Sequence, residues 1–309
     1  MPLIDNETKG VFVIAVTPFT ETMQVDDASI DSMVDFYFEK GADGLTILGM
    51  MGEAPKLTQS EAIHVTRRTI GRAGPKPVIV GVSAPGLAAI SELTKAAMDL
   101  GASGVMIAPP SSLRTDDQIL AYYQNVVAMI GSEVPVVLQD FPLVTNVVIS
   151  SATLGRIVET LPSVVMLKHE DWPGLGKISD VRAAEAEGRR RLSILCGNGG
   201  LFLPEEMRWG ADGAMTGFAF PEMMADVVRH SAAGAFEKAQ DIFDAYLPLV
   251  RYEQQPGIGL AVRKYVLAKR GAIASANQRS PGAALTHQAV AEVERLLARQ
   301  ERRLADLGR

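Results

Sequence analysis

The sequence is poor in cysteine and histidine, with a single cysteine, Cys196, and four histidines among 309 residues. One cysteine cannot form an intramolecular disulfide, so we expect a reducing compartment. So few Cys and His side chains also argue against a zinc site. Basic residues are also fewer than acidic ones. The chain has 30 Lys and Arg and 36 Asp and Glu, which gives a net charge of −6. An acidic chain lacks the basic face that nucleic acids require, and we expect no nucleic-acid partner.

Long apolar runs are missing too. The longest candidate segment, from Pro77 to Ile90, is interrupted by Gly81, Pro85 and Gly86, so no membrane span is predicted. The first ten residues, MPLIDNETKG, carry acidic groups and no apolar signal core, which favours a cytoplasmic protein. The Walker A pattern, a G-x-G-x-x-G after a strand and H-E-x-x-H are all absent, and we expect neither an organic cofactor nor a metal.

What the sequence does contain is a regular alternation of short apolar runs with amphipathic, helix-period segments. These runs are rich in Val, Ile and Leu without strict alternation, as in strands that are buried on both faces. The eight runs are Phe12–Phe19, Gly44–Gly49, Pro77–Val82, Gly104–Pro109, Val134–Phe141, Val164–Glu170, Leu192–Gly197 and Gly213–Phe220. Thr58 with Glu61 and Thr115 with Gln118 indicate capping boxes where two of the intervening helices begin.

Eight βα units in series predict a (β/α)8 TIM barrel, a fold that typically needs about 250 residues. We assign residues 1–220 to the barrel, and a doubly wound open sheet stays the structural alternative. After Phe220 the strand pattern stops, and residues 221–309 should hold the last barrel helix and a C-terminal helical domain. Its helical stretches are Ala235–Gln254, Ile258–Arg270 and His287–Leu307.

Lys168 is the most informative residue at the strand ends. Active sites of TIM barrels lie at the carboxyl ends of the strands, and Lys168 ends an apolar strand where a charge is unexpected. A dry pocket favours the free amine of a lysine, which can attack a carbonyl carbon. The alternative is a structural ion pair with Glu170 or Asp171. Because side chains alternate along a strand, Glu170 should share the side of Lys168 and His169 should face the helices.

Several motifs fall in a fixed order on the predicted strand ends. They are V-T-P-F at Val16–Phe19, G-x-x-G-E at Gly49–Glu53, Pro109 on the fourth strand, Pro142 after the fifth and Lys168 on the sixth. In this order the sequence resembles the N-acetylneuraminate lyase and dihydrodipicolinate synthase superfamily over nearly the whole chain. The resemblance implies a homotetrameric TIM barrel whose strand-six lysine, here Lys168, forms a Schiff base with a small 2-oxo acid.

The strand-end rule and the resemblance together predict the residues of the site. Lys168, Glu170 and Gln139 are the expected catalytic residues. The expected substrate-binding residues are Thr17, Gly49, Met50, Met51, Ser111, Gly197, Asn198 and Thr216.

The sequence also departs from the synthases and aldolases of that superfamily. Met50 and Met51 stand where those members usually have two hydroxyl residues, and Gln139 stands in place of a tyrosine that serves as acid–base. Pro110 and Ser111 replace a tyrosine pair, and Val144 replaces an arginine. In these respects the segments around Gln139, Lys168 and Thr216 resemble the branch that dehydrates 2-keto-3-deoxy sugar acids, in which a carboxylate beside the lysine moves the proton.

We therefore expect a Schiff-base lyase that dehydrates a 2-keto-3-deoxy sugar acid. One alternative is a dihydrodipicolinate synthase or pyruvate-dependent aldolase. The other is a barrel that binds a 2-oxo acid without catalysis, since fold alone does not fix function.

Overall fold

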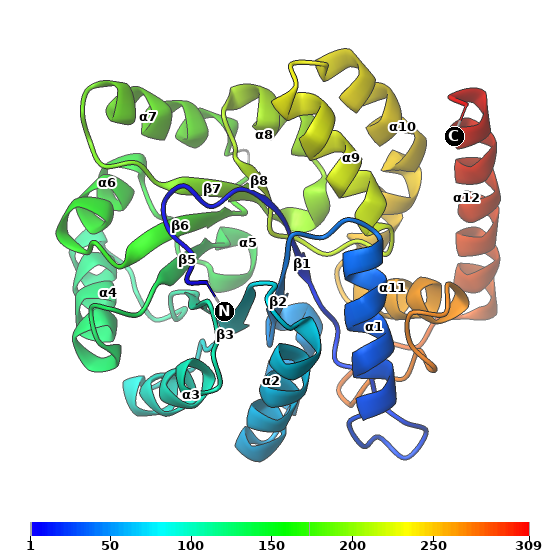
Figure 1. Ribbon diagram of the computed structural model, residues 1–309, viewed down its shortest axis with the longest axis horizontal. Coiled ribbons are helices and arrows are strands. Elements are labelled where there is room, and N and C mark those ends of the chain that lie inside the picture. Colours follow the sequence, from blue (N-terminus) through cyan, green and yellow to red (C-terminus); the bar gives the residue numbers. More distant parts are fainter. Residues whose placement is uncertain (1, 173, 309) are drawn as a thin grey trace.

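Eight parallel strands close into a barrel in the computed structural model, which describes residues 2–172 and 174–308. Each strand pairs with the next along the chain, and β1 also pairs with β8, with Val11 opposite Ala214. The closure confirms the predicted TIM barrel and excludes the open doubly wound sheet (Figure 1). The strands are β1 Gly10–Ile14, β2 Gly44–Ile47, β3 Val78–Gly81, β4 Gly104–Ile107, β5 Val136–Asp140, β6 Val164–His169, β7 Ser193–Cys196 and β8 Gly213–Ala214.

Helices surround the barrel as its outer layer (Figure 1). They are α1 Asp27–Glu39, α2 Gln59–Ala73, α3 Leu87–Asp99, α4 Asp116–Ile130, α6 Ser151–Thr160, α7 Leu175–Ala186, α8 Leu203–Trp209 and α9 Pro221–Ala232. Both predicted capping boxes are present, with Thr58 before α2 and Thr115 before α4. Short helical turns follow three of the strands at the carboxyl end of the barrel. They are η1 Met50–Gly52 with η2 Ala54–Lys56 after β2, α5 Pro142–Thr145 after β5, and η3 Asn198–Gly200 after β7.

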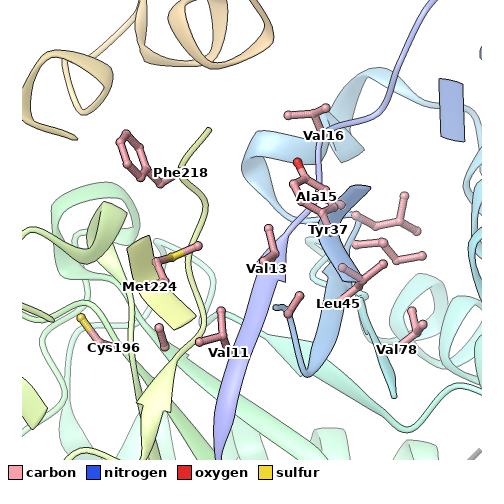
Figure 2. Close-up of a cluster of buried hydrophobic side chains, with 14 of the residues drawn as sticks. Val11, Val13, Ala15, Val16, Tyr37, Leu45, Val78, Cys196, Phe218 and Met224 are labelled. Carbon is pink, nitrogen blue, oxygen red and sulfur yellow. The ribbon is translucent and has the colours of Figure 1, made fainter. Parts of the chain in front are cut away.

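Two apolar cores arise from the alternation of side chains along the strands. The inner core fills the barrel and consists of Ile4, Phe12, Ile14, Ile79, Met106, Val137, Met166, Leu195 and Met215. The outer core lies between strands and helices, and Val11, Val13, Leu45 and Val78 belong to it together with Tyr37 of α1 (Figure 2). The barrel interior is therefore a packed core and not a pore.

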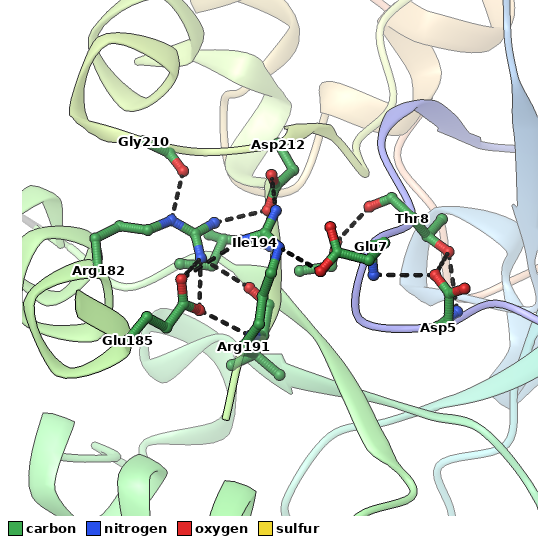
Figure 3. Close-up of polar contacts among 11 residues, drawn as sticks. Asp5, Glu7, Thr8, Arg182, Glu185, Arg191, Ile194, Gly210 and Asp212 are labelled. Atoms are coloured by element: carbon green, nitrogen blue, oxygen red, sulfur yellow. Dashed lines mark hydrogen bonds and ion pairs between the residues drawn. The ribbon is translucent and has the colours of Figure 1, made fainter. Parts of the chain in front are cut away.

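An ion-pair network holds the chain at the amino-terminal ends of β7 and β8 (Figure 3). Asp212 accepts from Arg182 at 2.6 Å and from Arg191 at 2.5 Å. Glu185 pairs with the same two arginines, and Arg191 reaches Glu7 of the N-terminal segment. These charged groups pair with one another at the end of the barrel opposite to the candidate site, so we assign them a role in the stability of the fold.

The chain continues after the barrel in three helices, as predicted: α10 Phe236–Glu253, α11 Gly259–Lys269 and α12 His287–Asp306. The last helix lies beside α10 (Figure 1). The division into two domains at residue 220 stays a prediction. No helix within the described ranges has both the length and the apolar character that a bilayer crossing demands.

The predicted eighth strand, Gly213–Phe220, is wrong in length, because β8 ends at Ala214. Met215 N and Thr216 O still bond to the backbone of β7 and β1, but from Gly217 onward the backbone bonds to side chains of the C-terminal region. Gly217 O accepts from Arg263, Ala219 O accepts from Arg270, and Ala219 N donates to a carboxylate of α10. Residues far along the chain thus take the place of a neighbouring strand, which an apolar run cannot reveal.

Candidate active site

A cavity of about 440 Å³ opens at the carboxyl ends of the strands. Its size is in the range of small-molecule sites. The residues predicted for the site that line it are Met50, Met51, Gln139, Lys168, Glu170, Asn198 and Thr216. Val144 lines it too, together with residues between α10 and α11.

Strand β6 delivers Lys168 to this cavity. Met166, two residues earlier, belongs to the inner core, so the same side of the strand carries Lys168 and then Glu170 toward the mouth of the barrel. In the ladder between β5 and β6, Gln139 is the direct partner of Lys168. All three side chains are buried, with 4–5% of their surface exposed.

The three polar side chains form one hydrogen-bonded group. Lys168 Nζ lies 3.1 Å from Glu170 Oε2, and the same oxygen accepts from Gln139 Nε2 at 2.7 Å. The other carboxylate oxygen, Oε1, accepts from Asn198 N at 3.1 Å. Three donors thus hold one carboxylate in a fixed place beside the lysine.

Gly197 makes room for this carboxylate. A Cβ atom at position 197 would lie 2.2 Å from Glu170 Cγ, which is impossible without displacing the glutamate. Asn198 follows with a left-handed backbone (φ 48°), and this turn points its N–H at Glu170. The loop after β7 therefore positions Glu170, and it does so through its backbone.

His169 points outward to the helices, as predicted. Its Nδ1 lies 3.0 Å from Glu206 of α8, and its Nε2 lies 3.1 Å from Gly174 O. Burial disfavours the charged imidazole, but the hydrogen bond and charge of Glu206 outweigh it and raise the pKa of His169 above 6.5. Nearby, Lys177 pairs with Asp140 at 2.5 Å and with Asp171 at 2.7 Å. These charges brace the outer side of β5 and β6.

Four of the predicted substrate-binding residues do not belong to the cavity lining. Ser111 is exposed on the loop after β4, and Thr17 is buried with its hydroxyl donating to Gly52 O at 2.6 Å. Gly49 begins the turn η1, and Gly197 accommodates Glu170. Roles of these four in substrate binding stay predictions.

The glutamate of the G-x-x-G-E segment has a structural role. Glu53 is buried in a left-handed conformation (φ 55°), and it accepts from Lys264 at 2.5 Å and Lys56 at 2.8 Å. Burial lowers the pKa of Lys264 to about 8, although Glu53 opposes this change. The pair fastens the turn after β2 to helix α11.

Residues of the C-terminal region that were not predicted also line the cavity, among them Glu253 of α10, Gln254 directly after it and Arg263 of α11. Helical periodicity assigns such residues to a helix but does not tell which of them meets the barrel mouth. The lining contains no tyrosine within the described residues. Tyr123, near β4, is buried with its hydroxyl directed at Ile107 O. Likewise, no three His, Cys, Asp or Glu residues of the described chain are grouped to hold a metal ion.

The sequence of residues 7–300 matches the model of the dihydrodipicolinate synthetase family. The chain belongs to this family. Among curated members of the dihydrodipicolinate synthetase family, it is 29% identical over 285 residues to an L-2-keto-3-deoxyarabonate dehydratase from Azospirillum brasilense, with 88% of each chain covered. It is 32% identical over 302 residues to a 4-hydroxy-tetrahydrodipicolinate synthase from Sorangium cellulosum, covering 94% of this chain and 97% of the relative.

A solved structure of the dihydrodipicolinate synthetase family is similar over almost the full length. The dihydrodipicolinate synthase from Rhodopseudomonas palustris superposes with a TM-score of 0.96 at 55% identity, covering 97% of this chain and 100% of that one. Members of the family are lyases that include dehydratases, aldolases and synthases, and this protein is an enzyme of that class. Membership in this class of enzymes argues against the alternative of a barrel that binds a 2-oxo acid without catalysis.

Proposed function

We propose that the protein dehydrates a 2-keto-3-deoxy sugar acid through a Schiff base on Lys168. The observation that carries the proposal is the buried group of Lys168, Glu170 and Gln139 at the mouth of the barrel, with no tyrosine in the described lining. The similarity to a 2-keto-3-deoxyarabonate dehydratase supports it as well.

The first step uses the amine of Lys168. After the ammonium has lost a proton to solvent, the free amine attacks the keto carbon C2 of the substrate and forms a carbinolamine. The carbinolamine hydroxyl takes a proton from solvent and leaves as water, which gives a protonated Schiff base. The orphan N–H groups of the turn η1, at Met50 and Met51, face no partner within the turn and can bind the substrate carboxylate.

The second step is the elimination. The cationic Schiff base draws electrons from C3, and Glu170 removes a C3 proton to form the enamine. The enamine electrons then expel the C4 hydroxyl, which takes the proton from Glu170 and leaves as water. Hydrolysis of the remaining Schiff base returns the free amine and the product, so the net change is the loss of one water molecule.

Gln139 has an orienting role in this scheme. Its amide does not titrate, and it donates to Glu170 Oε2, the oxygen that also faces Lys168. This hydrogen bond holds the carboxylate between the amine and the substrate. Elimination breaks no C–C bond, and one carboxylate suffices to move its protons, which is why a site without the tyrosine favours dehydration.

The test is chemical trapping of the Schiff base followed by assay. Borohydride should reduce the adduct with pyruvate and add its mass to the peptide that contains Lys168. Lys168→Ala should abolish trapping and turnover without loss of fold, whereas Lys177→Met, which removes a buried lysine on the outer side, should still be trapped. Trapping at another lysine would overturn the proposal.

A second candidate is the synthase reaction, in which enzyme-bound pyruvate condenses with an aldehyde. It is favoured by the similarity to the two synthases described above. The two reactions separate in one assay panel. A dehydratase consumes a 2-keto-3-deoxy sugar acid without a second substrate, whereas a synthase consumes pyruvate only when an aldehyde is present.

A further inference from the structure

Arg263 of α11 has an unusual position for an arginine. It is the largest of the fully buried side chains, with 2% of its surface exposed, and it lines the cavity at the barrel mouth. Its Nε donates to Glu253 Oε1 at 2.5 Å, and its Nη2 donates to Gly217 O. Its remaining nitrogen, Nη1, is buried without a hydrogen-bond partner in the described chain. A buried donor without a partner is costly, which indicates that something else satisfies it.

Gly217 lets this nitrogen reach the site. A Cβ atom at position 217 would lie only 2.0 Å from Arg263 Nη1, so the nitrogen occupies the space of a side chain. Gly217 itself lines the cavity, next to Thr216. The unpaired N–H groups of Arg263 are therefore placed where the chain beyond β8 borders the cavity.

Gln254, at the end of α10, repeats this arrangement. Its Nε2 is also buried without a partner in the part of the chain that the structure describes. A Cβ atom at Gly199 would lie 2.0 Å from that nitrogen, and both Gly199 and Gln254 line the cavity. Gly199 and Gly217, which lie just beyond the ends of β7 and β8, are thus each in contact with one unpaired donor nitrogen from the C-terminal region.

We propose that Arg263 Nη1 and Gln254 Nε2 form a subsite that binds hydroxyl oxygens of the substrate at the end remote from its keto group. This inference rests on the proposed function and adds the feature of the substrate that the C-terminal helices recognise. The subsite lies on the β7–β8 side of the mouth, adjacent to Asn198, whose N–H holds Glu170.

The charges of the subsite select a neutral hydroxyl over a second carboxylate. Glu253 is fully buried and accepts from Arg263 Nε at 2.5 Å and from Ala219 N at 3.3 Å. The guanidinium charge is therefore already balanced within the protein. A second substrate carboxylate would bring an uncompensated charge into a buried place, whereas a hydroxyl oxygen brings only an acceptor.

Two substitutions test the subsite. Gln254→Met keeps the length of the side chain and breaks no side-chain hydrogen bond found in the described chain, since Nε2 has no partner there. Arg263→Lys keeps a cation beside Glu253 but removes Nη1. Gln240→Met, on α10 but outside the cavity lining, is the matched control and should leave kcat/KM unchanged.

The two probes are pyruvate, which has no hydroxyl group, and 2-keto-3-deoxyarabonate, which carries hydroxyl groups. We expect Gln254→Met to lower kcat/KM for the sugar acid about tenfold, the effect of one lost hydrogen bond, and Arg263→Lys to lower it at least as much. The pyruvate concentration that gives half-maximal borohydride trapping should not change. Unchanged kcat/KM in Gln254→Met, or an equal loss with pyruvate, would overturn the subsite.

The failure of the proposed function has a different signature. If the wild-type protein is neither trapped by pyruvate nor active on sugar acids, the Schiff base on Lys168 is wrong. The subsite is then judged by calorimetric binding of 2-keto-3-deoxyarabonate to Lys168→Ala protein, which needs no covalent bond. Adding Gln254→Met to that protein should raise the Kd about tenfold, and an equal Kd, or no binding, would overturn the inference.

Discussion

Lys168 Nζ lies 3.1 Å from Glu170 Oε2, and both side chains line the mouth of the barrel, Lys168 from β6 and Glu170 from the position directly after this strand. A spacing of two residues at the end of one strand thus brings an amine and a carboxylate into contact. The pair is equally suited to a structural ion pair and to the Schiff-base chemistry proposed above. Kinetic tests on the two residues separate these roles.

Glu170→Gln should keep borohydride trapping with pyruvate but lower turnover by about 10²- to 10⁴-fold, the usual contribution of a general acid–base. The amide can still accept the hydrogen bond from Asn198 N, but it cannot take the C3 proton. Single-turnover kinetics on a 2-keto-3-deoxy sugar acid measure the effect. Glu206→Gln, which changes a buried carboxylate on the outer side, serves as control. Wild-type turnover in Glu170→Gln would leave Glu170 as an ion-pair partner alone.

Met51→Thr should change substrate preference more than stability. Met51 lines the cavity and packs against the inner core, so a threonine there makes the wall more polar. We expect the ratio of kcat/KM between two sugar acids to change about tenfold, with an unfolding free energy within about 1 kcal/mol of wild type. Met129→Thr, an exposed position on α4, is the control. If every kinetic constant of Met51→Thr equalled that of wild type, the residue would not contact substrate.

The stability of the barrel should depend on pH through His169. Burial favours the neutral ring, but Glu206 outweighs burial and raises the pKa of His169 above 6.5 in the folded state. The folded state then binds more protons than the unfolded state, so the stabilisation is present below about pH 6.5 and is lost as pH rises through the folded pKa.

Urea unfolding of wild type and His169→Gln across this range measures the contribution. The difference in unfolding free energy should be largest in acid and should shrink as pH rises. Gln288→Ala, at an exposed position of α12 without a titratable side chain, should show no such trend. A difference that grows with pH would reverse the sign of the effect and contradict the pairing with Glu206.

The assembly prediction concerns the loop after β4. The family resemblance implies a homotetramer with the segment Ser111–Leu113 near a subunit interface, and Ser111 is exposed in the single chain. Light scattering at micromolar concentration should therefore give a mass of four chains. Ser111→Arg should reduce this mass, whereas Ser60→Arg, also exposed, should not. A clean monomer of the wild-type protein would rule out the tetramer.

The sequence by itself determined the barrel and the side on which its strand residues point. Eight apolar runs separated by helix-period segments predict closure, since each run must be buried on both faces. The period of two along β6 then places Lys168 and Glu170 inward and His169 outward, and the structure agrees. Such features depend on local spacing, which is why they can be derived from the order of residues.

Only the tertiary structure decided which distant groups meet at the mouth. Gln139 and Asn198 N bond to Glu170 because β5 and β7 flank β6, and Arg263 reaches Gly217 because α11 packs over the end of β8. It also ended β8 at Ala214, and from Gly217 onward side chains of the C-terminal region replace a strand as hydrogen-bond partners. These contacts join residues up to 46 positions apart. Their formation depends on how whole elements pack, and no local pattern of side chains encodes that.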